Sequence, residues 1–374
     1  MKRITTVLLA FFLFCTANLN VRTFEDKKPS VSAEAYVLYC ADNSQVILSG
    51  NLHKKLGCAS TTKIMTSLLA LEAAMKEDTV VTFSEEMTAE GSSMYLKAGD
   101  RLKLSDLAKG MMTVSGNDAA NAVALTLCDT FEDFSALMNK RAKEIGMETT
   151  HFETPSGLPS DNHYSTAYDL ALLMQEAMNN KDFASLTSKK TVEVEFIKPS
   201  GQKVTYSNHN RLLSLYPDCI GGKTGYAKST GRCLVTCSER EGLRLICVTL
   251  NASDDWNDHK ALYEYGFSKY AALDSCDEKY PSALIGGENE FVNALPQDNA
   301  TVVVSAEDKE KVHKVVYVTP CVFAPVKKGD TLGRVVYYLG EEIISETALV
   351  AEENVDRASL NFFKRIMLRI FGQG

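Results

Sequence analysis

The chain has 374 residues, of which 45% are hydrophobic and 24% are charged, and its formal net charge is -8. This length and composition fit one large folded domain with a smaller companion. The negative charge argues against a nucleic-acid-binding protein, because such proteins carry basic surfaces for the phosphates.

The first residues are typical of a secretory signal peptide. Met1-Lys2-Arg3 is basic, residues 7–14 are almost wholly apolar, and small residues stand just before a cleavage site expected after Ala17. The apolar run is much shorter than the roughly 20 residues that span a bilayer, so an uncleaved membrane anchor is the weaker interpretation. We therefore predict a signal peptide over residues 1–17 and export of the chain.

A serine and a lysine then stand at the start of a predicted helix. Residues 35–40 and 45–48 have the pattern of a β-hairpin, and apolar residues from Ile64 to Leu71 recur at helical spacing. Ser60 and Lys63 would share one helix face near its N-terminus, within hydrogen-bond reach. A serine nucleophile needs such a base, and lysine serves only where burial or a nearby cation lowers its pKa. A helix-capping serine followed by a surface lysine is the alternative.

The rest of the large domain alternates from helices to strands. The predicted helices cover residues 104–112, 117–128, 131–145, 166–178 and 258–270. The predicted strands cover residues 192–197, 203–206, 223–226, 232–238 and 244–250. Strands at both ends of the sequence around a helical middle describe an α+β domain, an antiparallel sheet flanked by helices.

Two further motifs complete a known set. Ser115-Gly116-Asn117 follows an apolar run, and Lys223-Thr224-Gly225 opens a predicted strand. Ser-x-x-Lys, Ser-x-Asn and Lys-Thr-Gly occur together in class A β-lactamases and penicillin-binding proteins. From about residue 34 to 250 the chain resembles the serine D-alanyl-D-alanine carboxypeptidases of peptidase family S11, the low-molecular-mass penicillin-binding proteins. Further matching segments are Glu90–Met94, Thr154–Leu158, His163–Ala167 and Gly231–Val235. Gly222 departs from the family, which usually has a bulkier aliphatic residue there.

The resemblance implies a β-lactamase-like transpeptidase fold and an acyl-enzyme mechanism without cofactor or metal. Ser60 would attack the carbonyl between the last two D-alanines of a peptidoglycan stem peptide, and Lys63 would take its proton. Ser115 would relay a proton to the leaving amine. β-Lactam antibiotics would acylate the same serine.

The remaining motif residues would hold the substrate. Asn117 is expected to bind the peptide amide, and Lys223 with Thr224 suits the terminal carboxylate. Gly225 and Tyr226, the next residues of the strand, are also expected to bind the substrate. By resemblance, the oxyanion would lie between the backbone N–H groups of Ser60 and Tyr226. Arg211 matches loosely a family position near the carboxylate, and a surface arginine is the equal alternative.

Other functions were weighed against this one. A class A β-lactamase would need a Glu-x-x-Leu-Asn segment between the second and third motifs, and no glutamate there is followed by such a pair. An inactive wall-binding protein would lack the nucleophile or the base, yet both are present. A D,D-endopeptidase that cuts peptidoglycan crosslinks uses the same residues, so this alternative stays open.

The cysteines and histidines do not indicate a metal site. Ten cysteines are present, and removal of Cys15 with the signal peptide leaves an odd number that cannot all pair within one chain. They are scattered without a Cys-x-x-Cys spacing, so most are expected to be small buried hydrophobic residues. The six histidines do not cluster.

The C-terminal quarter of the chain has a different sequence pattern. After a catalytic domain over residues 34–275, short β-rich runs predict a small all-β domain over residues 277–350. The tail, residues 356–374, carries a basic amphipathic pattern too short to span a bilayer, with apolar residues Leu360, Phe363, Ile366, Met367 and Ile370 on one helical face. Such a tail suggests a helix lying in the membrane interface. A helix packed on its own domain is the alternative. We predict peripheral attachment at the outer face of the cytoplasmic membrane.

Overall fold

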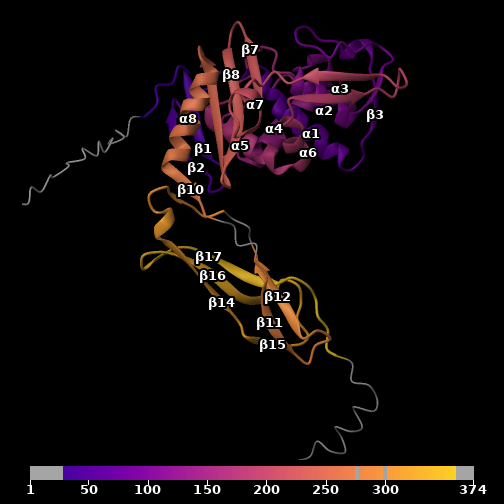
Figure 1. The fold of residues 1–374 in the computed structure, drawn as a ribbon. Helices are drawn as coiled ribbons and strands as arrows, with labels where there is room; N and C mark the ends of the chain where they lie inside the picture. The colour runs from indigo at the N-terminus through magenta and orange to yellow at the C-terminus, as the bar shows by residue number, and fades with distance from the viewer. Residues whose placement is uncertain (1–27, 274–277, 298–300, 359–374) are drawn as a thin grey trace, which may run out of the picture.

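The computed structural model describes residues 28–273, 278–297 and 301–358. The predicted signal peptide and the amphipathic segment from residue 359 lie outside the described residues. Figure 1 shows a larger body of mixed helices and strands above a smaller body made of strands. The α+β class predicted for the larger body and the all-β class predicted for the smaller one are both confirmed.

A five-stranded antiparallel sheet forms the centre of the larger body, in the order β2-β1-β9-β8-β7. Its strands are β1 (Ala35–Cys40), β2 (Gln45–Gly50), β7 (Cys219–Ala227), β8 (Gly231–Arg240) and β9 (Leu243–Ala252). Pairing of β1 with β9 brings the two ends of the domain's sequence together. Strand β7 lies at the edge of the sheet and carries the Lys-Thr-Gly motif.

Helices cover both faces of this sheet, which explains why β1 is apolar almost throughout. Val37 and Tyr39 belong to one hydrophobic core, while Leu38 and Cys40 belong to another on the opposite face. Alternate residues of a strand point to opposite faces, so two cores require apolar residues at consecutive positions. Helix α5 (Ala167–Asn179) packs on one face and α8 (Asp255–Lys269) on the other.

The structure contains every predicted helix of the body and adds two short ones, over residues 181–187 and 212–215, that the sequence did not indicate. Its other helices are α1 (Lys63–Ala74), α2 (Leu104–Thr113), α3 (Asn117–Leu127), α4 (Phe131–Ile145), α6 (Lys181–Thr187) and α7 (Leu212–Leu215), with 3-10 turns η1 (Ala59–Thr62) and η2 (Glu85–Met87). Side chains of Thr130, Thr166 and Asn180 accept hydrogen bonds from the first-turn N–H groups of α4, α5 and α6. Two short hairpins lie apart from the main sheet, β3 (Val80–Thr82) with β4 (Arg101–Lys103) and β5 (Thr191–Glu195) with β6 (Lys203–Ser207).

Gly221 in β7 lets α6 approach the sheet closely. A Cβ on Gly221 would lie 2.3 Å from the Thr187 methyl group, and the Thr187 hydroxyl bonds both the N–H and the C=O of Gly222 at 2.9 and 3.1 Å. At Gly222 itself, φ is +153° and a Cβ would lie 2.4 Å from the Val235 carbonyl oxygen of β8, so the bulkier residue usual in the family does not fit this backbone.

The smaller body is a six-stranded sheet in the order β14-β16-β17-β12-β11-β15. Its strands are β11 (Tyr280–Ile285), β12 (Phe291–Pro296), β14 (Val312–Val318), β15 (Cys321–Phe323), β16 (Thr331–Leu339) and β17 (Glu342–Ala351), with a 3-10 turn η3 (Lys309–Lys311). Isolated bridges from Val355 to Val326 and from Arg357 to Gly287 continue this body past the predicted end at residue 350.

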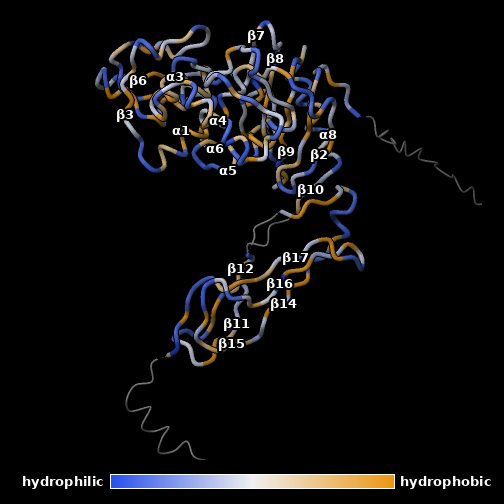
Figure 2. The backbone as a smooth tube through the Cα atoms, turned by 180° about the vertical axis from the view of Figure 1, so that it is seen from behind, coloured by the Kyte–Doolittle hydropathy of each residue, from blue (hydrophilic) through white to orange (hydrophobic). Residues whose placement is uncertain are grey.

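A short strand pair joins the two bodies. Strand β13 (Val303–Ser305), predicted as part of the small domain, pairs instead with β10 (Tyr270–Ala272) directly after α8. Figures 1 and 2 both show β10 at the junction. An ion pair of 3.1 Å between Lys309 and Glu241 lies beside it.

Candidate active site

Ser60 lies in the 3-10 turn η1, directly before helix α1. The preceding Ala59 has a φ of +46°, a left-handed conformation that is uncommon outside glycine. Two glycines allow backbone to pack on this turn: a Cβ on Gly225 of β7 would lie 3.0 Å from Ser60 N, and one on Gly157 would lie 1.9 Å from Ala59 O. The turn that carries Ser60 is therefore held between two neighbouring segments.

Lys63 is fully buried beneath this turn. Its Nζ lies 2.9 Å from Ser60 Oγ and donates a hydrogen bond of 2.6 Å to the Ser156 carbonyl. Burial holds the pKa of Lys63 well below its usual range, and the nearby Lys223 ammonium lowers it further, while Asp118 acts in the opposite direction. The geometry and the charge balance thus favour a neutral amine that can accept the serine proton.

Lys223 links the second and third motifs. It is 1% exposed, and its Nζ donates hydrogen bonds to Ser115 Oγ at 3.1 Å and to the Thr224 carbonyl at 2.8 Å. Burial lowers the pKa of Lys223 to about 7. Ser115 precedes helix α3 with a φ of +62°, again a left-handed conformation for a residue with a side chain.

Asn117 is the first residue of α3 and is 5% exposed. Its Nδ2 donates a hydrogen bond of 2.6 Å to the Glu90 carbonyl, and its backbone N–H donates one of 2.7 Å to the Ser92 carbonyl. Its Oδ1 is buried and has no hydrogen-bond partner among the described residues. A buried acceptor without a partner is uncommon in native proteins, and Asn117 itself is not among the residues that line the cleft described next.

A cleft of about 410 Å³ opens over these motifs. It is lined by Ser60, Ser92, Ser115, His209, Thr224, Gly225, Tyr226, Arg232, Asp255 and Trp256. Arg211 is not in this lining; it lies exposed, directly before α7.

The arginine that does line the cleft is Arg232, which the motifs did not single out. It pairs with the buried Asp255 at 2.5 Å, and its guanidinium lies 5.9 Å from the Trp256 ring centre. Arg232 is also the residue opposite Tyr226 in the β7–β8 register. The sequence contained one usable signal, since directly paired residues share a face of the sheet and Tyr226 was already expected at the site.

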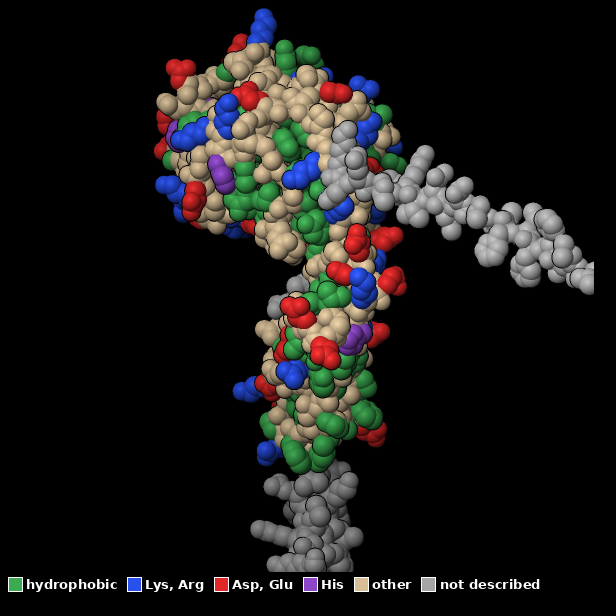
Figure 3. Space-filling view, turned by 90° about the vertical axis from the view of Figure 1, so that its left-hand side faces the viewer, with side chains coloured by type: hydrophobic (Ala, Val, Ile, Leu, Met, Phe, Trp, Pro, Cys, Tyr) green, Lys and Arg blue, Asp and Glu red, His purple; other side chains and the backbone are tan. Residues whose placement is uncertain are grey.

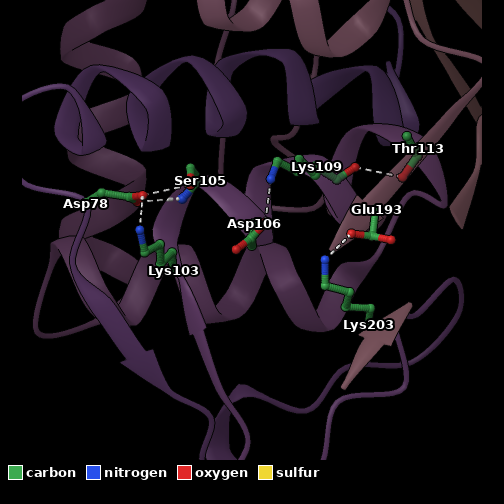
Figure 4. A network of polar contacts seen from close by, with 8 residues as sticks. All are labelled: Asp78, Lys103, Ser105, Asp106, Lys109, Thr113, Glu193 and Lys203. Atoms are coloured by element: carbon green, nitrogen blue, oxygen red, sulfur yellow. Dashed lines mark hydrogen bonds and ion pairs between the residues drawn. The ribbon is translucent and has the colours of Figure 1, made fainter. Parts of the chain in front are cut away.

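A separate hollow of about 570 Å³ lies where α1, α2, α6 and β5 meet. Two of its charged side chains pair with residues outside the lining, as Figure 4 shows: Lys109 contacts Asp106 at 2.6 Å, and Glu193 contacts Lys203 at 2.8 Å. No serine in this lining forms a hydrogen bond to a lysine of the described chain, so the nucleophile-and-base arrangement of the Ser60 cleft is not repeated among these residues.

Neither a metal cluster nor a disulfide occurs in the part of the chain that the structure describes. Eight described cysteines are free, and six of them are buried: Cys40, Cys58, Cys219, Cys233, Cys237 and Cys247. This agrees with the expectation that most cysteines act as small buried hydrophobic residues.

A serine hydrogen-bonded to a buried lysine, beside the edge strand of an antiparallel sheet, defines a serine peptidase of the penicillin-binding-protein fold. Residues 22–254 match the D-alanyl-D-alanine carboxypeptidase family, peptidase S11, and residues 277–357 match the C-terminal domain of penicillin-binding protein 5. The chain belongs to this family, which confirms the resemblance seen in the sequence.

Named relatives and solved structures agree along almost the whole chain. D-alanyl-D-alanine carboxypeptidase DacC of Escherichia coli is 32% identical over 95% of this chain and 91% of its own length. DacF of Bacillus subtilis is 29% identical over 98% of both chains. The crystal structure of penicillin-binding protein 5 from Haemophilus influenzae superposes with a TM-score of 0.65 at 26% identity, covering 88% of this chain and 99% of that one.

Proposed function

We propose that this protein is a serine D-alanyl-D-alanine carboxypeptidase, which removes the terminal D-alanine from peptidoglycan stem peptides and is acylated by β-lactams. The observation that carries this conclusion is the contact of 2.9 Å between Ser60 Oγ and a fully buried Lys63. Its family membership and the names of its relatives support the same activity.

Acylation follows from the contacts of Lys63. In the neutral amine an N–H can still donate to the Ser156 carbonyl, while the lone pair accepts the proton of Ser60 Oγ. The serine oxygen then bonds to the carbonyl carbon between the two D-alanines. The negative charge formed on the carbonyl oxygen is stabilised by the backbone N–H groups of Ser60 and Tyr226.

Collapse of this intermediate breaks the peptide bond and releases D-alanine, whose amine must gain a proton. Ser115 is suited to supply it, since Lys223 donates to Ser115 Oγ at 3.1 Å and can restore the hydroxyl proton. The proton that Lys63 took from Ser60 must then pass through the Ser115 hydroxyl to Lys223, which leaves Lys63 neutral. Water attacks the acyl-enzyme, Lys63 takes its proton, and that proton passes to the Ser60 oxygen as the ester bond breaks. The cycle restores Ser60 and releases the shortened stem peptide.

Substrate recognition uses a cation that has no carboxylate partner among the described residues. Within the described residues, the hydrogen bonds of Lys223 go to a hydroxyl and a backbone carbonyl, so its ammonium charge is not neutralised by an ion pair. The terminal carboxylate of the substrate, placed between Lys223 and the Thr224 hydroxyl, would supply the negative charge that pairs with this ammonium group. Asn117 Oδ1 would accept the substrate's amide N–H. Arg211 can contact the substrate carboxylate, as the sequence suggested, only if the bound substrate extends beyond the residues that line the cleft.

The test is to incubate the purified enzyme with a stem peptide ending in D-Ala-D-Ala and to measure free D-alanine. We expect release by the wild type and none by Ser60→Ala, with closely similar thermal unfolding. A crosslinked stem-peptide dimer, assayed in parallel, measures the D,D-endopeptidase alternative. Cleavage of the dimer without release of D-alanine from the monomer would replace the proposed activity with that one.

We also propose that the enzyme is exported and attached to the outer face of the cytoplasmic membrane. The N-terminal signal-peptide pattern supports export, and the basic amphipathic pattern of residues 359–374 supports attachment. The last described residue, Ala358, donates its N–H to the Gly286 carbonyl in the small body, beside Ile285 and its strand partner Phe323. These two side chains are 47% and 74% exposed, and Figure 3 shows hydrophobic side chains gathered at that end.

A further inference from the structure

A buried histidine, His163, joins the two segments that hold Lys63. It is 5% exposed and is not among the residues that line the cleft. Its Nε2 lies 2.8 Å from Thr62 Oγ1, and its Nδ1 accepts hydrogen bonds from the backbone N–H groups of Glu153 at 3.1 Å and Thr154 at 3.3 Å. One imidazole ring therefore contacts both the nucleophile turn and the segment that precedes Ser156.

These contacts fix the tautomer of the ring. Because Nδ1 accepts two N–H groups, it carries a lone pair, and the single proton of a neutral imidazole must be on Nε2. Burial lowers the pKa of His163 to about 4, so the ring is neutral at pH 7. Nε2–H then donates to Thr62 Oγ1, and the Thr62 hydroxyl donates to the Ala59 carbonyl at 2.8 Å.

The first chain of hydrogen bonds ends on the residue that precedes the nucleophile. Ala59 has a left-handed φ of +46°, so its peptide needs outside contacts to stay in place. The Thr62 hydroxyl supplies such a contact, and His163 orients that hydroxyl.

The second chain ends on the carbonyl that binds Lys63. The two residues that follow Thr154 are also held by hydrogen bonds. The Pro155 carbonyl accepts one from Thr66 Oγ1 at 2.6 Å, and the Ser156 carbonyl accepts one from Lys63 Nζ at 2.6 Å. A displacement of the Glu153–Ser156 segment would therefore move the acceptor that positions the Lys63 amine.

We propose that His163 is a positioning residue for the acylation step, holding the Ala59–Thr62 turn and the Glu153–Ser156 segment in the register that keeps Lys63 Nζ within reach of Ser60 Oγ. This inference rests on the proposed function. It predicts that His163 controls the rate of bond formation and not the affinity for the ligand, because its side chain does not line the cleft.

The test compares His163→Leu with His163→Gln in penicillin acylation, with the noncovalent affinity and the acylation rate constant measured separately. Leucine removes all three hydrogen bonds of the ring, and we expect the rate constant to fall about tenfold or more with unchanged affinity, since small misplacements of catalytic groups have large effects. Glutamine offers one acceptor and one donor, so we expect it to restore the rate to within about threefold of wild type.

Two further variants sharpen the comparison. His151, a neighbouring histidine whose Nδ1 contacts the Asn162 carbonyl, provides a matched control, and His151→Leu should acylate normally. Thr62→Val removes the hydroxyl that His163 orients. If His163 acts partly through Thr62, the effects of Thr62→Val and His163→Leu on the rate should combine less than additively.

Several results would overturn the proposal. A folded His163→Leu enzyme that is acylated at the wild-type rate would show that His163 contributes packing only. A glutamine variant as slow as the leucine variant would exclude the hydrogen-bonding role. If the leucine variant does not fold, the glutamine variant decides. Nitrogen NMR of the imidazole gives a check independent of activity: a proton on Nδ1 at pH 7 would contradict the proposal even if the wild type were never acylated. Failure of wild-type acylation with the expected tautomer would instead count against the proposed function.

Discussion

Gly157→Ala should damage catalysis through a backbone clash that can be sized from the structure. The added Cβ would lie 1.9 Å from the Ala59 carbonyl oxygen, whereas contacts shorter than 3.0 Å are essentially never seen, so that oxygen must move by about 1.1 Å. Ala59 directly precedes Ser60. Because a misplacement of 1 Å can lower a rate about a hundredfold, we expect acylation by penicillin to slow by roughly that factor.

Gly201→Ala is a control with the same backbone conformation and no clash. Gly157 and Gly201 have φ values of +79° and +77°, but nothing lies within 4 Å of the Cβ position at Gly201. Both variants should lose about 1 to 2 kcal/mol of stability from the left-handed backbone. Only Gly157→Ala should lose more stability than this, as measured by denaturant unfolding, and only Gly157→Ala should be acylated slowly. Equal stability and equal acylation rates in the two variants would refute the packing argument.

The remaining predictions concern the two lysines and the tail. Lys63→Arg should slow acylation by at least about a hundredfold, because arginine cannot accept the serine proton; stopped-flow acylation at a normal rate would show that another base activates Ser60. Since the pKa of Lys223 is lowered to about 7, KM for a peptide with a free carboxylate should rise as pH increases through that value, and a flat KM would contradict the role of the ammonium. Between pH 7 and the usual lysine pKa of 10.5 the unfolded chain binds more protons at Lys223 than the folded one, so the free energy of unfolding should rise with pH in this range. A chain ending at Asp356 should stay active on a soluble peptide yet fail to sediment with anionic vesicles, and its unfolding or inactivity would show that the tail belongs to the folded body.

The sequence predicted the fold best where one regular pattern of apolar residues continues through a whole helix or strand. The helix predicted at 131–145 coincides with α4, and the strand predicted at 35–40 coincides with β1. Both have strong periodic or continuous apolar patterns whose burial the structure explains. Helix α6, by contrast, begins directly after α5 at Lys181 and has only seven residues, too few for a clear helical repeat.

The site was predictable in its residue types and not in its backbone. The three motifs named Ser60, Lys63 and Lys223, but the left-handed conformations of Ala59 and Ser115 come from tertiary contacts that no local pattern encodes. The same holds for Arg232, which reaches the cleft through its pairing in the sheet and its contact with Asp255. Residues positioned by long-range contacts are those that single-sequence reasoning misses.

The most direct test of the account is to identify the residue that penicillin labels. Peptide mapping by mass spectrometry after incubation with penicillin should place one covalent adduct on Ser60, because its Oγ contacts the buried Lys63 at 2.9 Å and lines the cleft. Ser60→Ala should give no adduct while unfolding almost as the wild type does. An adduct on a different residue, or an unlabelled but folded wild-type protein, would contradict the assignment of Ser60 as the nucleophile.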